Sequence, residues 1–407
     1  MAESEVLNIL VFTTLYPNNI WPNNGVFVKE RMVHAARSKE CSVKVVAPVP
    51  WFPPIKLGSR WMYSQIHHKE IVEGLDVWHP RYFLVPKTAM ALHGFTMFLS
   101  ILPAIKRLQR TFDFDIIDAH YVYPDGLAGV LLGRCLKKPV VVSARGSDIN
   151  SFSEFPSIRP LLQKALNTAD RVIAVSDALK QAMVRLRVPS DKIFVIPNGV
   201  DLTKFYSIPK HEARKSLDLP LDRKIILSVA SLTPNKGGDL LINSLKILKE
   251  RDNRQCPYLV LVGEGPFRSK LEGSISHLRI DKDVRLVGAV PHRDLYKWYS
   301  AADLFCLASA REGWPNVILE SLACGTPVVA TGVGGIPEIL SEDEVGILTD
   351  RSEKAIANSI HVALRKSWSY DACIRHAQKY SWERAALSIR SVFESAMEAG
   401  ARTRANA

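Results

Sequence analysis

Residues 311–340, "REGWPNVILESLACGTPVVATGVGGIPEIL", join a predicted helix, a short apolar strand and a glycine-rich turn. The helix begins at Pro315, a residue that suits a first helical turn, and meets no helix breaker before Ala323. Gly325 and Pro327 end the helix, and the β-branched run that follows is typical of a buried parallel strand. This order of elements predicts an α/β protein.

Two carboxylates interrupt this otherwise apolar stretch. Glu312 and Glu320 stand eight positions apart, with Asn316 midway between them. Residues four apart share a helix face, so we expect Asn316 and Glu320 to point the same way, with Glu312 in the loop just above. An uncompensated buried carboxylate costs several kcal/mol, and no Lys or Arg lies within one turn of Glu320. Either the hydroxyl groups of a ligand, or a distant backbone N–H or arginine in the core, must satisfy this carboxylate.

The composition indicates a two-domain protein. At 407 residues and 47% hydrophobic composition, the chain is long enough for two substantial cores. Its six scattered cysteines form no C-x-x-C pair and indicate buried thiols in a reducing compartment. The N-terminus is acidic before a short apolar run, which predicts a first strand and not a secretory signal. The longest apolar stretch, residues 88–105, contains His93, Gly94 and Pro103 and falls short of a membrane span. We therefore expect a soluble cytoplasmic protein.

The net charge of +12 includes two short basic clusters, at residues 106–110 and 134–138. Neither cluster has the interleaved aromatic residues or the motif of a nucleic-acid-binding protein, so nucleic acid is not an expected partner. The clusters are either solvated helix faces or, beside the apolar residues 94–105, a surface for peripheral contact with an anionic membrane at its inner face.

Short β-branched runs alternate with amphipathic helical segments along the whole chain, as in "LNILVFTT", "PVVVSAR" and "KIILSVASL". This alternation is the pattern of parallel sheets buried on both faces, and it predicts two doubly wound α/β halves. Proline and polar residues interrupt the rhythm at "IPNGVDLTKFYSIPKHEARKSLDLP", residues 196–220, where we expect the boundary between the halves.

Unusual residues follow the predicted strands repeatedly. Gly25 comes after the first strand and His120 ends the fourth, while "ARGSD", "SLTPNKGG" and "SAREG" follow the fifth, eighth and eleventh strands. Ligands of doubly wound sheets bind outside the carboxyl ends of the strands. Amides and a lysine for phosphates, together with carboxylates for hydroxyl groups, are what a nucleotide-sugar site requires.

At these residues the chain resembles the retaining GT-B glycosyltransferases of family 4, the glycosyl transferases group 1. The strongest match is "EGWPNVILE", two glutamates separated by seven residues, followed by "ACGTPVVAT" and "GGIPEIL". The motifs "IPNGVD", "SLTPNKG", "LVGEGP" and "LVGAVPHRDL" support it, and "DAHYVYPDG" and "ARGSD" extend it into the first half. The resemblance implies two Rossmann-like domains facing each other across a cleft. Residues 1–198 would form the acceptor domain and 199–380 the nucleotide-sugar donor domain, with a C-terminal helix at about 381–398 packed back onto the first.

The resemblance also implies roles for the residues of the opening stretch. Glu320 would accept hydrogen bonds from the ribose hydroxyls of the donor, and Glu312 would face the donor sugar as a catalytic residue. The amides of Asn316 and Val317 would meet the diphosphate, where the helix dipole favours negative charge. Gly313 would belong to the same donor-binding turn.

Four further residues are assigned by the same resemblance. Lys236 would reach a phosphate as a catalytic point charge, and the backbone of Val290 would meet the base. Gly25 would let the N-terminal loop approach the diphosphate. His120 would touch the transferring sugar as a third catalytic residue.

One position departs from the family pattern. Similar enzymes carry an arginine five residues before the lysine of "NKG", whereas this chain has Ser231 there. A charge-assisted hydrogen bond is roughly twice as strong as a neutral one, so the leaving group loses stabilisation unless another cation replaces the arginine. Arg145 is the candidate phosphate-binding replacement, and the alternative is that Arg145 pairs with Asp148 or another local acid.

Other motifs are weaker. The Asp-x-Asp of "DFDIID", residues 113–118, leads into a strand, so no metal is expected there. "GVGGIPE" and "GEGP" do not complete a dinucleotide fingerprint, which argues against an oxidoreductase.

The resemblance therefore implies a transferase that moves a sugar from a nucleotide-diphosphate sugar to a hydroxyl acceptor with retention of configuration. The acceptor would be a glycan or a lipid-linked sugar in polysaccharide, glycolipid or cell-envelope glycan synthesis, and no cofactor or metal is expected. The alternatives are a nucleotide-sugar epimerase of the same fold and a non-catalytic nucleotide-sugar-binding protein.

Overall fold

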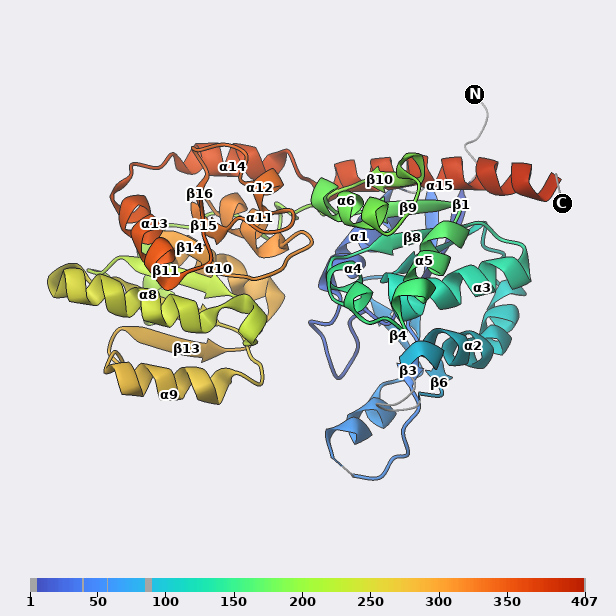
Figure 1. The fold of residues 1–407 in the computed structure, drawn as a ribbon, viewed down its shortest axis with the longest axis horizontal. Helices are drawn as coiled ribbons and strands as arrows, with labels where there is room; N and C mark the ends of the chain where they lie inside the picture. The colour runs from blue at the N-terminus through green and yellow to red at the C-terminus, as the bar shows by residue number, and fades with distance from the viewer. Residues whose placement is uncertain (1–5, 39, 57, 85–89, 406–407) are drawn as a thin grey trace. The chain divides into compact units, whose positions relative to one another are not determined.

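The computed structural model describes residues 6–38, 40–56, 58–84 and 90–405. The chain forms two compact units, one from Met1–Asn198 with Trp382–Ala407 and the other from Gly199–Ser381 (Figure 1). Each unit is a mainly parallel sheet with helices packed on its faces. The α/β class with Rossmann-like sheets is confirmed.

The first unit is built on an eight-stranded sheet in the order β10-β9-β8-β7-β1-β2-β5-β4. All neighbouring strands in it are parallel except β4, which pairs antiparallel with β5. The strands are β1 (Leu7–Phe12), β2 (Cys41–Val46), β4 (Lys69–Val72), β5 (Leu75–Trp78), β7 (Ile116–His120), β8 (Val140–Ala144), β9 (Arg171–Ala174) and β10 (Ile193–Val195). Two short strands, β3 (Val49–Pro50) and β6 (Arg81–Tyr82), form a separate parallel pair.

Two helices of the first unit pack against each other and the sheet, although one comes from each end of the chain. These are α1 (Val26–Arg37) and α15 (Trp382–Ala405), and Trp382, Ile389 and Phe393 of α15 are buried in the same core as the central strands. A second group of helices contains α2 (His93–Gln109), α3 (Leu127–Leu136) and α5 (Arg159–Thr168), with α3 against β7 and β8 (Figure 1). The short helices α4 (Ser147–Asn150) and α6 (Asp177–Arg185) follow β8 and β9.

The second unit is built on a fully parallel six-stranded sheet in the order β13-β12-β11-β14-β15-β16. Its strands are β11 (Ile225–Val229), β12 (Tyr258–Val262), β13 (Val284–Gly288), β14 (Leu304–Leu307), β15 (Val328–Thr331) and β16 (Gly346–Thr349). One group of helices, α8 (Gly238–Arg251), α9 (Arg268–Leu278) and α13 (Glu353–Arg365), packs together. The other group is α7 (Lys210–Ser216), α10 (Leu295–Ala301), α11 (Asn316–Ala323) and α14 (Tyr370–Gln378), and the short α12 (Ile336–Ile339) follows β15.

Strand β4 is an edge strand that the sequence did not predict. Its connection to β5 is a tight turn in which Glu73 has φ 47° and Gly74 has φ 87°. A turn with two positive φ values matches the right-handed twist of a hairpin, but it is most often marked by Asn-Gly or Asp-Gly. Ile71 on β4 is 76% exposed, so the strand also lacks the buried face that alternation would reveal.

Candidate active site

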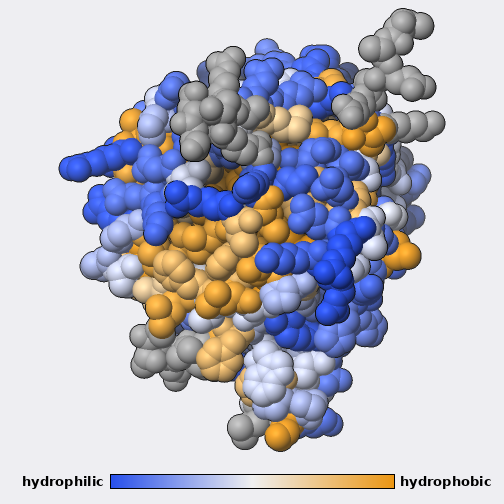
Figure 2. Space-filling view, turned by 90° about the vertical axis from the view of Figure 1, so that its right-hand side faces the viewer, coloured by the Kyte–Doolittle hydropathy of each residue, from blue (hydrophilic) through white to orange (hydrophobic). Residues whose placement is uncertain are grey.

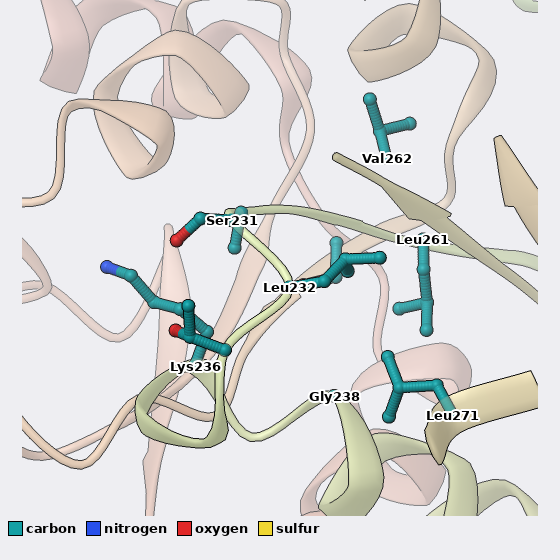
Figure 3. A pocket seen from close by; sticks show the side chains of 10 residues that line it. Ser231, Leu232, Lys236, Gly238, Leu261, Val262 and Leu271 are labelled. Atoms are coloured by element: carbon teal, nitrogen blue, oxygen red, sulfur yellow. The ribbon is translucent and has the colours of Figure 1, made fainter. Parts of the chain in front are cut away.

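The strand order of the second unit reverses between β11 and β14, and the loops after these two strands carry several predicted site residues. Ser231 follows β11, and Lys236 ends a 3₁₀ turn, Pro234–Lys236, that leads into α8. Figure 3 shows the Ser231 hydroxyl and the Lys236 side chain pointing to the same side, away from Leu261 and Leu271. A cavity of about 10 Å³, room for about one water molecule, lies among these residues. Ligands of doubly wound sheets bind at such a reversal point.

Lys236 and Glu312 form an ion pair in this place. The Lys236 ammonium lies 2.6 Å from Oε1 of Glu312, and the hydroxyl of Ser309 donates to the same oxygen at 2.6 Å. The lysine side chain is 26% exposed and the glutamate side chain 10% exposed. The structure therefore brings together two residues predicted for different parts of the donor, and it adds Ser309, which the sequence did not single out.

Close backbone packing fixes the loop that carries Glu312. Gly334 has φ 57°, and a Cβ there would lie 1.9 Å from the carbonyl oxygen of Glu312. Gly237 has φ 67°, and a Cβ there would lie 2.3 Å from the carbonyl oxygen of Ala308. Only glycine fits at both positions. The glycines of "NKGG" and "GVGG" thus allow the loops after β11 and β15 to pack closely against the loop after β14.

Helix α11 is present as predicted, over Asn316–Ala323 with Pro315 just before it, and its last six residues are buried. Asn316 and Val317 form its half-buried first turn. Gly313 is buried in the preceding loop, where its carbonyl accepts from the Gly335 amide at 3.2 Å. The N-terminus of a helix carries partial positive charge, which favours anions at this end of α11.

The partners of Glu320 differ from both alternatives that the sequence left open. The Tyr299 hydroxyl donates to Oε2 at 2.8 Å, and Nε2 of His292 lies 3.0 Å from Oε1. A carboxylate only accepts hydrogen bonds, so this histidine nitrogen carries a proton. Burial and the neighbouring Glu320 carboxylate raise the pKa of Tyr299 well above its usual range. The carboxylate is thus satisfied by two side chains from the segment around α10, and no ligand is needed to compensate it.

Val290 lies in the loop after β13 and is half-buried. Strand β13 is the edge strand of the sheet, two strands from β11. The loop with Val290 follows the carboxyl end of β13, and the loop with Lys236 follows the carboxyl end of β11. Both loops therefore lie at the same edge of the sheet.

In the first unit, His120 ends β7 and its side chain is fully buried. The Arg145 guanidinium donates to Nδ1 of His120, and Nε2 lies 2.8 Å from Oδ2 of Asp118, although not in hydrogen-bonding orientation. Nδ1 is therefore an acceptor, so Nε2 carries the proton of the neutral ring. Burial, reinforced by Arg145 and opposed by Asp118, lowers the pKa of His120 to about 4. Both ring nitrogens face protein groups, and the expectation that this side chain touches the sugar stays a prediction.

Arg145 is half-buried after β8, and its guanidinium is held by neighbours other than an acid. It donates to Oδ1 of Asn198 at 3.0 Å and lies 5.3 Å from the centre of the Phe27 ring. Its backbone N–H, and not its side chain, donates to Asp148. Burial and the nearby Arg31 lower the pKa of Arg145. Asp148 and the buried Asp118 both lie near enough to act electrostatically on the guanidinium, so the phosphate role of Arg145 and its alternative, pairing with Asp148 or another local acid, both stay predictions.

Gly25 is required by the local backbone. It has φ 64° at the start of α1, and a Cβ there would lie 2.1 Å from the carbonyl oxygen of Leu15. The loop after β1 is also tied down by Asp125, which accepts from the Thr14 amide at 2.6 Å and the Thr14 hydroxyl at 2.9 Å. Burial raises the pKa of Asp125 to about 7. The motif "YPDG" contains this acid, but nothing in the sequence indicated its partners.

Two family models match the chain in consecutive segments. Residues 31–204 match the model described as Glycosyltransferase Family 4, and residues 209–380 match the model described as Glycosyl transferases group 1. A glycosyltransferase of Methanocaldococcus jannaschii, MJ1607, is 30% identical over 302 residues, which cover 70% of this chain and 76% of the relative.

The chain belongs to the family 4 GT-B glycosyltransferases.

Further relatives of this glycosyltransferase are known by more specific names. The Bacillus subtilis protein TuaC, named as a glycosyltransferase of teichuronic acid biosynthesis, is 29% identical over 87% of this chain and 88% of its own. The D-inositol 3-phosphate glycosyltransferase of Thermobispora bispora is 28% identical over 75% of this chain and 76% of its own.

Solved structures share the GT-B fold of this glycosyltransferase at low identity. Sucrose-phosphate synthase of Thermosynechococcus elongatus superposes with a TM-score of 0.77 at 20% identity, over 96% of this chain and 99% of the other. Anabaena HepE, in complex with UDP and glucose, superposes with a TM-score of 0.72 at 19% identity, over 96% and 100%.

No cluster of three His, Cys, Asp or Glu side chains is arranged to hold a metal ion within the described ranges. No helix in the same ranges is both long enough and apolar enough to cross a bilayer.

Proposed function

We propose that this glycosyltransferase transfers a sugar from a nucleotide-diphosphate sugar to a hydroxyl group, with retention of configuration and without a metal ion. The observation that carries the proposal is the Lys236–Glu312 ion pair beside the N-terminus of α11. A lysine that pairs with a carboxylate at the reversal point of the sheet can exchange that partner for an incoming diphosphate, because the diphosphate offers the same kind of anionic oxygen.

The donor diphosphate is the group that this site has to stabilise. As the bond to the sugar breaks, negative charge develops on the departing diphosphate, and fixed cations and amides stabilise such charge most effectively. Lys236, the Ser231 hydroxyl and the first amides of α11 are suited to this role. Glu320 already accepts from Tyr299 and His292, but a carboxylate has about four acceptor positions, which leaves capacity for ribose hydroxyls.

The buried state of His120 supports a mechanism that needs no protein base. Because both ring nitrogens face protein groups, the histidine is poorly placed to take a proton from an acceptor. In the proposed step, the acceptor oxygen bonds to the anomeric carbon on the face from which the diphosphate leaves. The bond from that carbon to the diphosphate oxygen breaks, and the same oxygen takes the acceptor's proton. His120 then acts as a positioning residue for Arg145.

The names of relatives support a role in cell-envelope polysaccharide or glycolipid synthesis. TuaC is named for teichuronic acid biosynthesis, and HepE has been solved with UDP and glucose. We propose the same general class for this chain: a nucleotide-sugar donor and a glycan or lipid-linked acceptor.

The proposal is tested with the wild type and two lysine variants. Thermal shift against nucleoside diphosphates first identifies the preferred base, because a ligand at 100 times its dissociation constant adds about 2.7 kcal/mol of stability. Calorimetry should then show that Lys236→Ala binds this nucleoside diphosphate roughly tenfold more weakly, or weaker still. Lys246→Ala, a matched change on the outer part of α8, should leave it unchanged.

Turnover distinguishes the alternatives. Release of nucleoside diphosphate with transfer to an acceptor, and with the product anomer matching the donor anomer by NMR, supports the proposal. Release that yields a free epimerised sugar without any acceptor would indicate an epimerase. Donor binding without turnover under any acceptor would indicate a non-catalytic protein, and an inverted product anomer would overturn the retaining mechanism.

We also propose that the first unit rests on an anionic membrane through the outer side of α2, in the cytoplasm. Figure 2 shows a broad apolar area bordered by hydrophilic residues on the side where α2 and α3 lie. Leu92 and Leu99 are 52% and 66% exposed, and the exposed Lys106 and Arg107 follow in the last turns of α2. Residues 88 and 89 of the predicted apolar stretch lie outside the described residues. Apolar side chains next to basic ones suit a surface of anionic lipid.

Vesicle sedimentation tests the membrane contact. Wild-type protein should bind vesicles of phosphatidylglycerol and phosphatidylcholine and should not bind phosphatidylcholine alone. Leu99→Glu should abolish binding, whereas Leu387→Glu, a leucine 64% exposed on α15, should not. Equal binding by both variants would contradict the proposal.

A further inference from the structure

A cavity in the first unit lies at the carboxyl ends of β1 and β2. Its volume is about 640 Å³, within the range of small-molecule sites. It is enclosed by the loop after β1, by β3 and β6, and by the 3₁₀ segment Ser59–Gln65. Asn18, Trp21, Asn24 and Tyr63 are among the residues that line it.

An aromatic pair forms one wall of this cavity. The rings of Trp21 and Tyr63 meet edge to face with centres 5.0 Å apart, and both side chains are half-buried. The backbone of Trp21 is fixed by two hydrogen bonds. Its N–H donates to Oδ1 of Asn18 at 2.9 Å, and its carbonyl accepts from the backbone N–H of Asn24 at 3.1 Å. A rigid aromatic surface offers large apolar contact at little entropic cost, and the C–H face of a sugar ring is a matching surface.

The polar groups of the cavity suit hydroxyl groups. The side-chain Nδ2 of Asn24 donates to the backbone carbonyls of Thr14 and Tyr16, at 3.1 and 3.2 Å. Its Oδ1 is therefore an acceptor with no partner among the described residues. The Oδ1 of Asn18 accepts from two backbone N–H groups, so its Nδ2 remains a donor with no partner among the described residues. A hydroxyl group both donates and accepts, so it can satisfy the two asparagines together.

His93 is the one basic side chain among the described residues that line the cavity. Among the described residues, none of the side chains that enclose the cavity is a lysine, arginine, aspartate or glutamate. Recognition of a phosphate ordinarily uses a cation or a set of helix N-terminal amides. The cavity therefore favours an uncharged ring over a phosphorylated cyclitol such as the one in the name of the Thermobispora bispora relative.

We propose that this cavity is the acceptor subsite and that it holds an uncharged sugar ring stacked on Trp21. The assignment rests on the proposed function, because it takes the first unit to supply the hydroxyl group that is glycosylated. The acceptor class is thus a neutral glycan end, and a phosphate-bearing acceptor would have to keep its phosphate outside this cavity. Asn18 and Asn24 select rings with adjacent hydroxyl groups.

The experiment measures binding of small neutral probes to the full chain in the presence of saturating nucleoside diphosphate. The probes are methyl glycosides of glucose, galactose, mannose and N-acetylglucosamine, and the charged competitors are inositol 1-phosphate and glycerol 3-phosphate. Saturation-transfer NMR should show at least one methyl glycoside bound in the millimolar range, with contacts from its C–H face. If no glycoside binds, or if a phosphorylated competitor binds more tightly than every glycoside, the proposal is wrong.

Variants connect the binding to the aromatic wall. Trp21→Ala should weaken the bound glycoside about 3- to 10-fold or more, and Tyr63→Leu should weaken it less. Trp51→Ala is the matched control, because Trp51 is 57% exposed and does not line the cavity. If glycoside affinity in Trp21→Ala equals that of Trp51→Ala, with both variants folded by circular dichroism, the aromatic wall does not hold the ring. Tyr63→Leu gives the same test if Trp21→Ala does not fold.

Nucleotide affinity is measured on the same samples. If the wild type binds nucleotide but no glycoside, only the proposed acceptor subsite is wrong, and the proposed function stands. Failure of the wild type to bind any nucleoside diphosphate or to turn over any nucleotide sugar would instead overturn the proposed function.

Discussion

Replacing Glu312 by Gln should tighten nucleotide binding and slow turnover. In the structure, Oε1 of Glu312 accepts from both Lys236 and Ser309 at 2.6 Å, so the carboxylate competes with a donor diphosphate for the lysine. A carboxamide keeps the shape and one accepting oxygen but removes the charge. The lysine is then more available to an incoming phosphate.

The size of the effect follows from the two kinds of hydrogen bond. In Glu312→Gln the Lys236 ammonium keeps its charge, so an ion pair becomes a hydrogen bond with one charged partner, and we expect the hold on Lys236 to weaken by about 1–1.5 kcal/mol. The lysine is 26% exposed, and solvent screening reduces this to about 1 kcal/mol. Nucleoside diphosphate should therefore bind roughly fivefold more tightly to Glu312→Gln. Turnover should fall about 100-fold, because a fixed charge near the transferring sugar is lost.

Calorimetry with the preferred nucleoside diphosphate and a coupled assay of its release measure the two quantities. Glu272→Gln, which changes a half-exposed glutamate on α9, is the matched control and should alter neither. Tenfold weaker binding of the nucleotide to Glu312→Gln would contradict this prediction, since Glu312 would then hold Lys236 in its binding position. Turnover at the wild-type level would contradict it as well.

Other changes test separate parts of the structure. Tyr299→Phe removes a hydrogen bond to a buried carboxylate and should lower the free energy of unfolding by about 1.5–3 kcal/mol in urea, whereas an unchanged value would mean that water replaces the hydroxyl. Ser231→Arg should tighten nucleoside diphosphate binding by about 1 kcal/mol, because it adds a positive charge beside the diphosphate. Arg145→Ala should mainly destabilise the first unit, and a larger effect on nucleotide binding would support its predicted phosphate role. The pKa of Asp125 is about 7 in the folded protein and about 4 in the unfolded chain. As pH rises from about 4, the unfolded chain therefore loses this proton before the folded protein does. Stability should therefore fall between pH 4 and 7 and then level off, Asp125→Asn should flatten this slope in denaturation series, and an unchanged slope would refute the assignment. Turnover should survive EDTA, and loss of activity that manganese restores would contradict a metal-free reaction.

The sequence predicted the fold because its signals are local. A parallel strand buried on both faces is a short β-branched run, and the glycines and prolines that end each element lie next to it in the chain. Helix α11 was predicted nearly to the residue for this reason. Strand β4 was missed because its turn, Glu73-Gly74, lacks the usual asparagine or aspartate.

The candidate site was harder to predict because its contacts are distant in sequence. Physical chemistry required a partner for Glu320, but only the fold brings Tyr299 and His292 to it from 21 and 28 positions away. The ion pair between Lys236 and Glu312 joins residues 76 positions apart. The hydrogen bond between Arg145 and His120 joins residues 25 positions apart at the ends of two neighbouring strands.

The course of the chain has a consequence for its synthesis on the ribosome. The first unit contains both the earliest residues and α15, whose Trp382 and Phe393 are buried in its core. Residues 199–381 contain a whole sheet and its helices, and all of them are translated between the first part of the first unit and α15. Of the two units, the one whose translation starts first therefore cannot close its core until α15 has been made. Until then, the surface that α15 covers on α1, β8 and β9 is open to chaperones during every round of translation.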